Sequence, residues 1–413
     1  MDINNQLAKL IDENPAPPLV FNTQINKVAN HYNVNTVQGD FIINNNQEPA
    51  KRKQKSRDIE EECDSSFYQT WKSFLDDAES NRNLHKYSPE KNGVLRFAHK
   101  LQARPSMSNI NNELKGFIDS LTINASTSLE ENIEDTINLK EYKPECRFIK
   151  KIFTVMLTVN KKLPPMTYSE AVFNHSLAHP CLPATATFLQ EATPLGPYFT
   201  PGEEPLQAMI EQLTIMDSKV DKRKTYNADG VIRLHELYDL EILLLETAGS
   251  FQSKDERKIS FDNIKGMFAL FAMMKTVADR FDYASVELFK KLKLYFVQAS
   301  DEYLRLWSIQ YISNGTYKFN GEDKIVVVED RSHVEQMLPS LLDFFYLVKT
   351  SLAKTCGLLQ QLKHQHEQNI DSNSQQTLLS DIICPKVFRL TYNRHGKGFA
   401  RQSVISSPES GSQ

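Results

Sequence analysis

Two short apolar runs flank a polar segment between residues 226 and 249. The first run, Gly230–Leu234, is β-branched. The second, Leu240–Leu245, is continuously apolar and has the length of a buried strand. His235–Asp239 between them is polar and reads as a turn. The pattern therefore predicts two neighbouring antiparallel strands.

Further elements follow toward the C-terminus. A helix from about Phe261 to Phe281 is apolar on all sides in its middle, which indicates burial against a sheet. The runs Leu292–Gln298 and Tyr303–Ile312 predict a hairpin. Tyr317–Phe319 and Lys324–Val328 add one or two strands. The resulting fold class is α/β, with a mixed sheet of about five strands flanked by helices.

A long helix is predicted over residues 333–368. Its first half carries apolar residues that must pack on the domain. Gln360–Gln368 is polar enough to protrude or to pair with a partner helix, so this helix is a candidate site for a protein partner.

Three segments lead into the predicted sheet. Arg147–Val159 is apolar enough to be a buried helix or strand. Thr167 is followed three residues later by Glu170, a capping-box pattern for a helix that should end before Pro180. Pro194–Pro205 is predicted to be a loop.

The remaining composition suggests four regions. Residues 1–64 are predicted to be disordered because the first 60 contain eleven asparagines and little periodicity. Residues 65–146 read as peripheral helices and linker, and 147–368 as the α/β domain. Residues 369–413 read as a mostly disordered tail.

Charge and cysteine content narrow the function classes. The net charge of −4 and the pI near 6.2 give no overall footprint of a nucleic-acid binder, so such contact requires a local patch. Five widely spaced cysteines indicate neither a disulfide framework nor a zinc ribbon. Because there is neither a membrane-spanning run nor a signal peptide, we expect an intracellular protein without membrane contact. Lys51–Arg57 has five basic residues in seven and can serve as a nuclear-import signal or as solvated linker charge.

Acidic residues stand at the ends of the two central strands. Asp229 begins the first and Glu246 ends the second, and antiparallel pairing brings those ends together. Buried carboxylates must be paired, protonated or bound to a cation. Magnesium binds one or two carboxylates together with water and phosphate oxygens, as in phosphodiester hydrolysis. Asp229 and Glu246 are therefore candidate catalytic residues and Mg²⁺ ligands.

These two residues resemble the acids of the PD-(D/E)XK nuclease-like superfamily. In that superfamily an Asp on one strand, and an acid followed two positions later by Lys on the next, hold the metal and the attacking water. The resemblance covers about Thr167–Glu329 and implies a restriction-endonuclease-like fold. Thr247 and Ala248 follow Glu246, so the lysine is absent from its expected place. The region from Tyr226 to Trp307 also looks like uncharacterised multi-copy proteins of early-diverging fungi, which brings no known activity.

Lysines elsewhere in the chain could replace the missing one, and the sequence singles out none of them. The candidates are Lys254, Lys258, Lys265 and Lys275. In the superfamily the glutamate of the first core helix sometimes points at the metal, which makes Glu170 a third candidate catalytic residue. Its simpler role is the helix cap.

Two other clusters are notable. Lys222, Arg223 and Lys224 lie just before Asp229 and are candidates for contact with substrate phosphate, or are part of a solvated loop. His175 and His179 are one helical turn apart, which is half of a zinc site, but no second pair at ligand spacing follows.

Two functions remain open. One is a nuclease-like protein associated with nucleic acid, whose ancestral reaction was metal-dependent phosphodiester cleavage. The alternative is a non-catalytic α/β scaffold or interaction module. In the alternative, Asp229-Gly230 forms a turn and Glu246 caps a loop or pairs with Arg233 or Lys265. A missing lysine is expected of a degenerate nuclease fold.

Overall fold

The structure is a computed structural model. The structure describes residues 34–38, 40–43, 72–97, 110–122, 129–159, 164–216, 226–328, 334–370 and 377–390. The chain divides into two compact units. Unit 1 comprises residues 1–100, 312–320 and 393–413, and unit 2 comprises 101–311 and 321–392. The predicted disorder of residues 1–64, the Lys51–Arg57 cluster and Lys222–Lys224 fall wholly or mostly outside the described residues.

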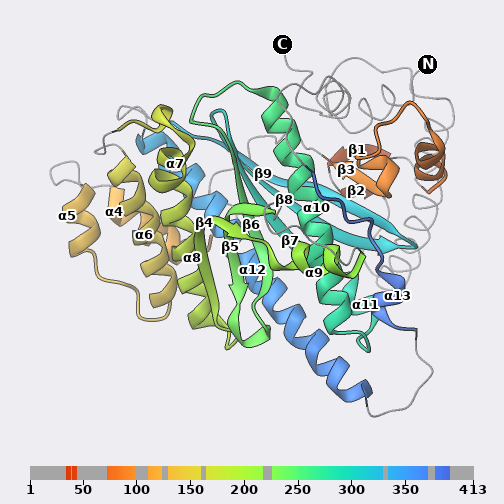
Figure 1. The fold of residues 1–413 in the computed structure, drawn as a ribbon. Helices are drawn as coiled ribbons and strands as arrows, with labels where there is room; N and C mark the ends of the chain where they lie inside the picture. Colours follow the sequence, from red (N-terminus) through yellow and green to blue (C-terminus); the bar gives the residue numbers. More distant parts are fainter. Residues whose placement is uncertain are drawn as a thin grey trace. The chain divides into compact units, whose positions relative to one another are not determined.

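Seven strands form one mixed sheet in the order β3-β9-β8-β7-β6-β5-β4, so the fold is α/β but the predicted count of about five strands was wrong (Figure 1). The strands are β3 (Val94–Phe97), β4 (Pro197–Pro205), β5 (Asn227–Leu234), β6 (Leu240–Ala248), β7 (Lys293–Ser300), β8 (Tyr303–Ser313) and β9 (Thr316–Val326). A separate antiparallel pair joins β1 (Val34–Gln38) and β2 (Asp40–Ile43).

The helices of the described segments, beside a helix over residues 72–80, differ widely in length. They are α4 (Asn112–Thr122), α5 (Leu129–Asp135), α6 (Lys143–Val159), α7 (Glu170–Phe173), α8 (His179–Ala192), α9 (Gln207–Met216), α10 (Glu256–Arg280), α11 (Val286–Phe289), α12 (Val334–Ile370) and α13 (Leu379–Ile382). Among the described residues, no helix combines the length and apolarity that crossing a membrane requires.

The predicted central strands are confirmed. β5 and β6 pair antiparallel, with Gly230 opposite Leu245 and Leu234 opposite Leu240. β6 then pairs parallel with β7. Parallel neighbours need a crossover connection, and the chain between them forms α10 and α11. β7 and β8 pair antiparallel, as the predicted hairpin requires.

β4 lies within Pro194–Pro205, which was predicted to be a loop, so that prediction was wrong. It lies at the edge of the sheet and pairs only with β5. Proline cannot donate a ladder hydrogen bond, and an edge strand tolerates it where the missing donor would face away from the neighbour. The register shifts between Pro201 and Glu204, which absorbs the irregular segment.

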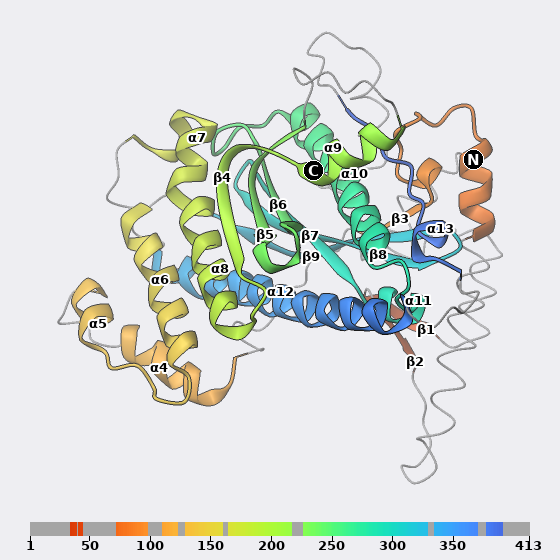
Figure 2. The same cartoon turned by 60° about the horizontal axis from the view of Figure 1, so that its bottom comes forward.

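Helices α10 and α12 cover the two faces of β7 (Figure 1, Figure 2). α10 packs closely, because a Cβ at Gly266 would lie 2.6 Å from the ring of Phe296. From α12, the Thr355 hydroxyl donates to the Lys293 carbonyl at 2.8 Å. The predicted buried helix and the predicted long helix therefore enclose the sheet.

The helix that begins at Glu170 does not end before Pro180. A π-helical segment, Asn174–Ala178, joins α7 to α8, so Pro180 lies directly after a departure from the regular α-helical hydrogen-bond pattern. The start also differs from the predicted capping box. The Ser169 hydroxyl accepts a hydrogen bond from the Val172 N–H and is the actual N-cap.

The polar end of α12 bonds within its own unit. Gln365 accepts a hydrogen bond from the Ser285 N–H at 3.1 Å, and His366 accepts one from the Tyr283 N–H at 3.2 Å. Part of the predicted tail also packs on this unit. The Leu379 N–H donates to the Asp282 carbonyl at 2.9 Å.

Candidate active site

A row of polar residues crosses the sheet of unit 2. The β5–β6 ladder ends at Gly230 and Leu245, so the next positions on the two strands are Asp229 and Glu246. Glu246 lies opposite Gln298 of β7, which lies opposite Arg305 of β8. Residues opposite one another on neighbouring strands point to the same face of the sheet. The two acids therefore lie at one level of one face.

Glu246 is buried and paired with a lysine from α10. Its side chain is 5% exposed, and its two oxygens accept from the Lys265 ammonium at 2.9 and 2.8 Å. The Tyr226 hydroxyl donates to the same carboxylate at 2.8 Å. Burial raises the pKa of Glu246, and the charge of Lys265 acts against that shift. Burial lowers the pKa of Lys265. The nearby acids, Glu246 first and then Asp262 and Asp229, raise it by more, so the net shift of this pKa is upward.

Asp229 is held at the start of β5 by the neighbouring strand. Its Oδ2 accepts from the Thr247 N–H at 2.6 Å. His179 Nε2 lies 2.9 Å from the Asp229 backbone carbonyl, which can only accept, so Nε2 carries the proton. Burial, and then the charges of Glu246 and Glu170, raise the pKa of Asp229 to about 7. The shift shows that these acidic groups interact.

Glu170 does not act as the predicted cap. Its Oε2 accepts from the Gly249 N–H at 2.8 Å and forms an ion pair with Lys258. Four residues on, Asn174 accepts from the Thr247 hydroxyl. The α7 and π-helical segment is thereby fastened to the end of β6, and Glu170 is brought to the same end of the strands as Asp229.

One face of α10 is turned toward this site. Lys258, Asp262 and Lys265 are spaced i, i+4 and i+7, which places them on one side of the helix. Lys258 donates to Glu170 and, at 3.3 Å, to the Thr247 carbonyl. Burial, followed by the charge of Glu246, raises the pKa of Asp262 well above its ordinary value. These are the functional candidates that the sequence did not single out, although charges recurring on one face of an apolar helix were a visible signal.

Two buried oxygens in this cluster are unsatisfied. Asp262 is 5% exposed, and its Oδ2 has no hydrogen-bond partner among the described residues. The same holds for the side-chain oxygen of Asn227, whose backbone carbonyl accepts from Lys265 at 3.0 Å. Orphaned acceptors indicate a place where a donor or a cation is missing.

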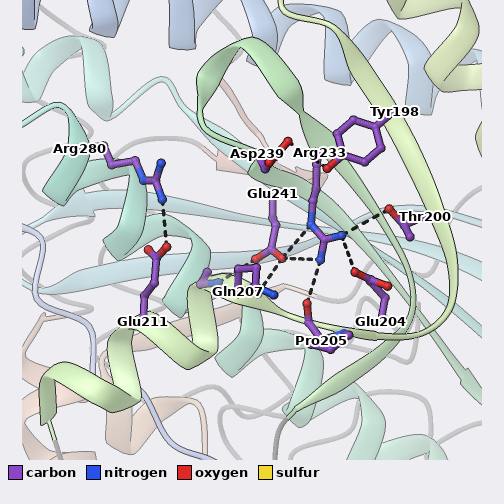
Figure 3. Close-up of polar contacts among 11 residues, drawn as sticks. Tyr198, Thr200, Glu204, Pro205, Gln207, Glu211, Arg233, Asp239, Glu241 and Arg280 are labelled. Carbon is purple, nitrogen blue, oxygen red and sulfur yellow. Dashed lines mark hydrogen bonds and ion pairs between the residues drawn. The ribbon is translucent and has the colours of Figure 1, made fainter. Parts of the chain in front are cut away.

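Arg233, one proposed partner of Glu246, belongs to a different network (Figure 3). Its guanidinium donates to Glu204 at 2.7 Å, to Glu241 at 3.1 Å and to the Pro205 carbonyl at 2.8 Å. Glu241 also accepts from the first backbone N–H groups of α9, so the network fastens that helix to the sheet edge. Arg233 thus has a structural role, and Lys265 is the partner of Glu246.

The structure brings no further metal ligand to the histidine pair within its described segments. Among the described residues, no group of three or more His, Cys, Asp or Glu side chains could hold a metal ion. Cys181 is buried, and burial raises the pKa of its thiol, so it is not a ready ligand. His175 is exposed, whereas burial lowers the pKa of His179.

The donor set at the strand ends consists of two carboxyl groups, Asp229 and Glu246, at one level of the sheet. Among the described residues, no further His, Cys, Asp or Glu side chain completes a metal-binding group with them. Mg²⁺ needs only one or two carboxylates when water and phosphate complete its shell. The ammonium of Lys265 occupies both oxygens of Glu246. A cation at Glu246 therefore requires Lys265 to leave it.

Comparison of this chain with protein-family models, curated proteins and solved structures found no match.

Proposed function

We propose that unit 2 is a nuclease-like domain whose site hydrolyses phosphodiester bonds in nucleic acid with the help of a divalent cation. One observation carries the proposal. α10 brings the Lys265 ammonium to 2.8 Å from Glu246, at the strand end that also holds Asp229. The two acids and a lysine thus lie together, as the resemblance to the PD-(D/E)XK superfamily requires, although the lysine comes from a helix and not from the strand.

Each residue has a distinct role in this proposal. Asp229 and Glu246 hold the cation, which supplies Lewis-acid stabilisation of the phosphate and a more acidic bound water. Lys258 and Lys265 place positive charge where the transition state gains negative charge. Glu170 keeps Lys258 in position. Lys222, Arg223 and Lys224 are proposed to contact the substrate backbone, which brings local positive charge to an acidic chain.

The proposal is tested by incubating the full chain with DNA and RNA in the presence of Mg²⁺. Asp229→Asn and Glu246→Gln should each reduce the cleavage rate by about 100-fold or more, because each removes a charged ligand of the reacting centre. Glu287→Gln is the matched control, since its side chain is 71% exposed and pairs only with Lys290. Equal cleavage in all four proteins would remove the two acids from the mechanism.

A second function, a non-catalytic scaffold, is favoured by one specific observation. The buried Glu246 is already neutralised by Lys265, and no group of three metal-binding side chains exists in the described segments. In that case the acid and lysine lock α10 onto the sheet, and partners bind elsewhere, for example through the helix over residues 333–368. A scaffold would show no Mg²⁺ binding.

A further inference from the structure

Two buried carboxyl groups beside the sheet share one nearby ammonium group. Glu246 and Asp262 are 4% and 5% exposed, and Lys265 contacts only the first of them. The other ammonium of the α10 face, Lys258, pairs with Glu170. Asp262 therefore has a buried oxygen with no hydrogen-bond partner among the described residues. A buried unsatisfied acceptor destabilises the folded state, so its retention calls for an explanation.

The geometry of α10 places this oxygen within reach of Lys265. Asp262 and Lys265 are three residues apart on one helix, where side chains are neighbours. Helical side chains lean toward the N-terminus of their helix, so the stem of Lys265 leans toward the turn that holds Asp262. The charges of both Lys265 and Glu246 also act on Asp262, because Glu246 raises its pKa and Lys265 lowers it. A change in the lysine side-chain rotamer is the movement that an exchange of partner requires.

We propose that Lys265 is an exchangeable counter-ion, which pairs with Glu246 in the cation-free site and moves to Asp262 when Glu246 binds a divalent cation. Asp262 is then a positioning residue that receives the displaced ammonium. It keeps the lysine beside the reacting phosphate when the cation is present. The cation part of this proposal rests on the proposed function, whereas the exchange between two carboxylates does not.

The exchange is tested first without any metal, through a double-mutant cycle on the unfolding equilibrium of the full chain. In Glu246→Gln the ammonium moves to Asp262, and in Asp262→Asn it stays on Glu246. Each single change is therefore partly compensated. The double variant leaves a buried ammonium without a carboxylate. If the two substitutions acted independently, their effects on the folding equilibrium constant would multiply. We expect the constant of the double variant to be at least tenfold lower than that product.

The control for this cycle is the same pair of substitutions in a Lys265→Met background. There the coupling should vanish, because the shared ammonium is gone. The exchange is overturned if, with Lys265 present, the effects of the two substitutions on the folding equilibrium constant simply multiply. This holds whether or not the protein binds a metal.

The second arm measures Mg²⁺ affinity by calorimetry. Asp262→Asn should weaken binding at least tenfold, because the displaced lysine has no acceptor, and Asp262→Glu should restore affinity to within about threefold of wild type. Lys265→Met should strengthen binding, since it removes the competitor for Glu246. Wild-type binding that Asp262→Asn leaves unchanged would overturn the exchange and leave the proposed function standing. If the wild type binds no Mg²⁺, the proposed function fails, and the metal-free cycle still decides the exchange.

Discussion

Burial governs the charges of the residues at the end of β5 and β6. Burial raises the pKa of Glu246, and Lys265 and Tyr226 oppose that shift because they replace part of the water that the carboxylate has lost. Burial, and then the charges of Glu246 and Glu170, raise the pKa of Asp229 to about 7, although the Thr247 N–H donates to its carboxyl group. Strongly shifted acids that face a specific charged partner are typical of functional sites, though structural ion pairs also produce them.

Lys265→Met should destabilise the protein by about 3 kcal/mol, because it leaves a buried carboxylate without its cation. The matched control is Lys363→Met on α12, where the pair with Glu367 spans 3.7 Å and both side chains are exposed. That change should cost about 0.5 kcal/mol or less. Urea unfolding of both variants measures the difference. Equal losses would show that Lys265 does not sustain the buried charge of Glu246.

Asp229→Asn should stabilise the protein in a pH-dependent way. Because the folded-state pKa of Asp229 is raised from 3.8 to about 7, the folded state binds the proton more tightly than the unfolded state. Stability from this group is therefore present below pH 4 and is lost as the pH rises to 7. The variant should match wild type near pH 3.5 and exceed it by about 4 kcal/mol at pH 8. Unfolding free energies of both proteins across this range check the sign. A constant difference would contradict the shifted pKa.

Among the elements, those with clean periodicity were predictable. β5, β6, the β7–β8 pair, α10 and α12 follow from apolar runs and helical patterns. β4 was missed because the segment reads locally as a loop, whereas an edge strand can contain proline. The continuation of the helix past Pro180 was missed because the π-helical segment before this proline is not visible in a local pattern. Both errors arise from tertiary position, which a local pattern does not contain.

The candidate site was predictable only in part for the same reason. Asp229 and Glu246 lie at strand ends that the pattern located. Lys265 lies 19 residues beyond Glu246, and only the packing of α10 selects it over the other lysines. Lys275, one of those alternatives, instead donates to Asp279 and to the Ser380 carbonyl. The position of Asp262 likewise depends on which face of α10 meets the sheet.

Close approach of α10 to the sheet predicts a cost for Gly266→Ala. The new Cβ would lie 2.6 Å from the Phe296 ring, so the helix or the ring must shift. We expect a loss of about 1 to 3 kcal/mol. Gly357→Ala on α12 is the control, because nothing lies within 4 Å of its Cβ position, and it should gain about 0.5 to 1 kcal/mol from helix propensity. Thermal unfolding of the two variants should shift in opposite directions. A gain for Gly266→Ala would argue against this packing.

For the whole molecule, the cysteines report on how unit 2 unfolds. Cys146, Cys181 and Cys356 are buried and free, whereas Cys384 is exposed. Burial raises the pKa of Cys356 to about 12, which makes its thiol unreactive in the folded state.

In a Cys63→Ser background, a thiol reagent should label Cys384 rapidly in the native protein. The three buried thiols should react only in denaturant. If their labelling follows the same denaturant midpoint as the loss of helix signal, unit 2 unfolds cooperatively. Rapid labelling of all four thiols in the native state would contradict the burial of the core.

The central claim is that the acids at the end of β5 and β6 form a cation site. Calorimetric titration of the full chain with Mg²⁺ tests it most directly, with Asp229→Asn and Glu246→Gln measured alongside and Glu287→Gln as the control. We expect binding by wild type and the control, and a loss of binding in both site variants. Absence of binding by the wild-type protein, or binding that survives both substitutions, would contradict the account.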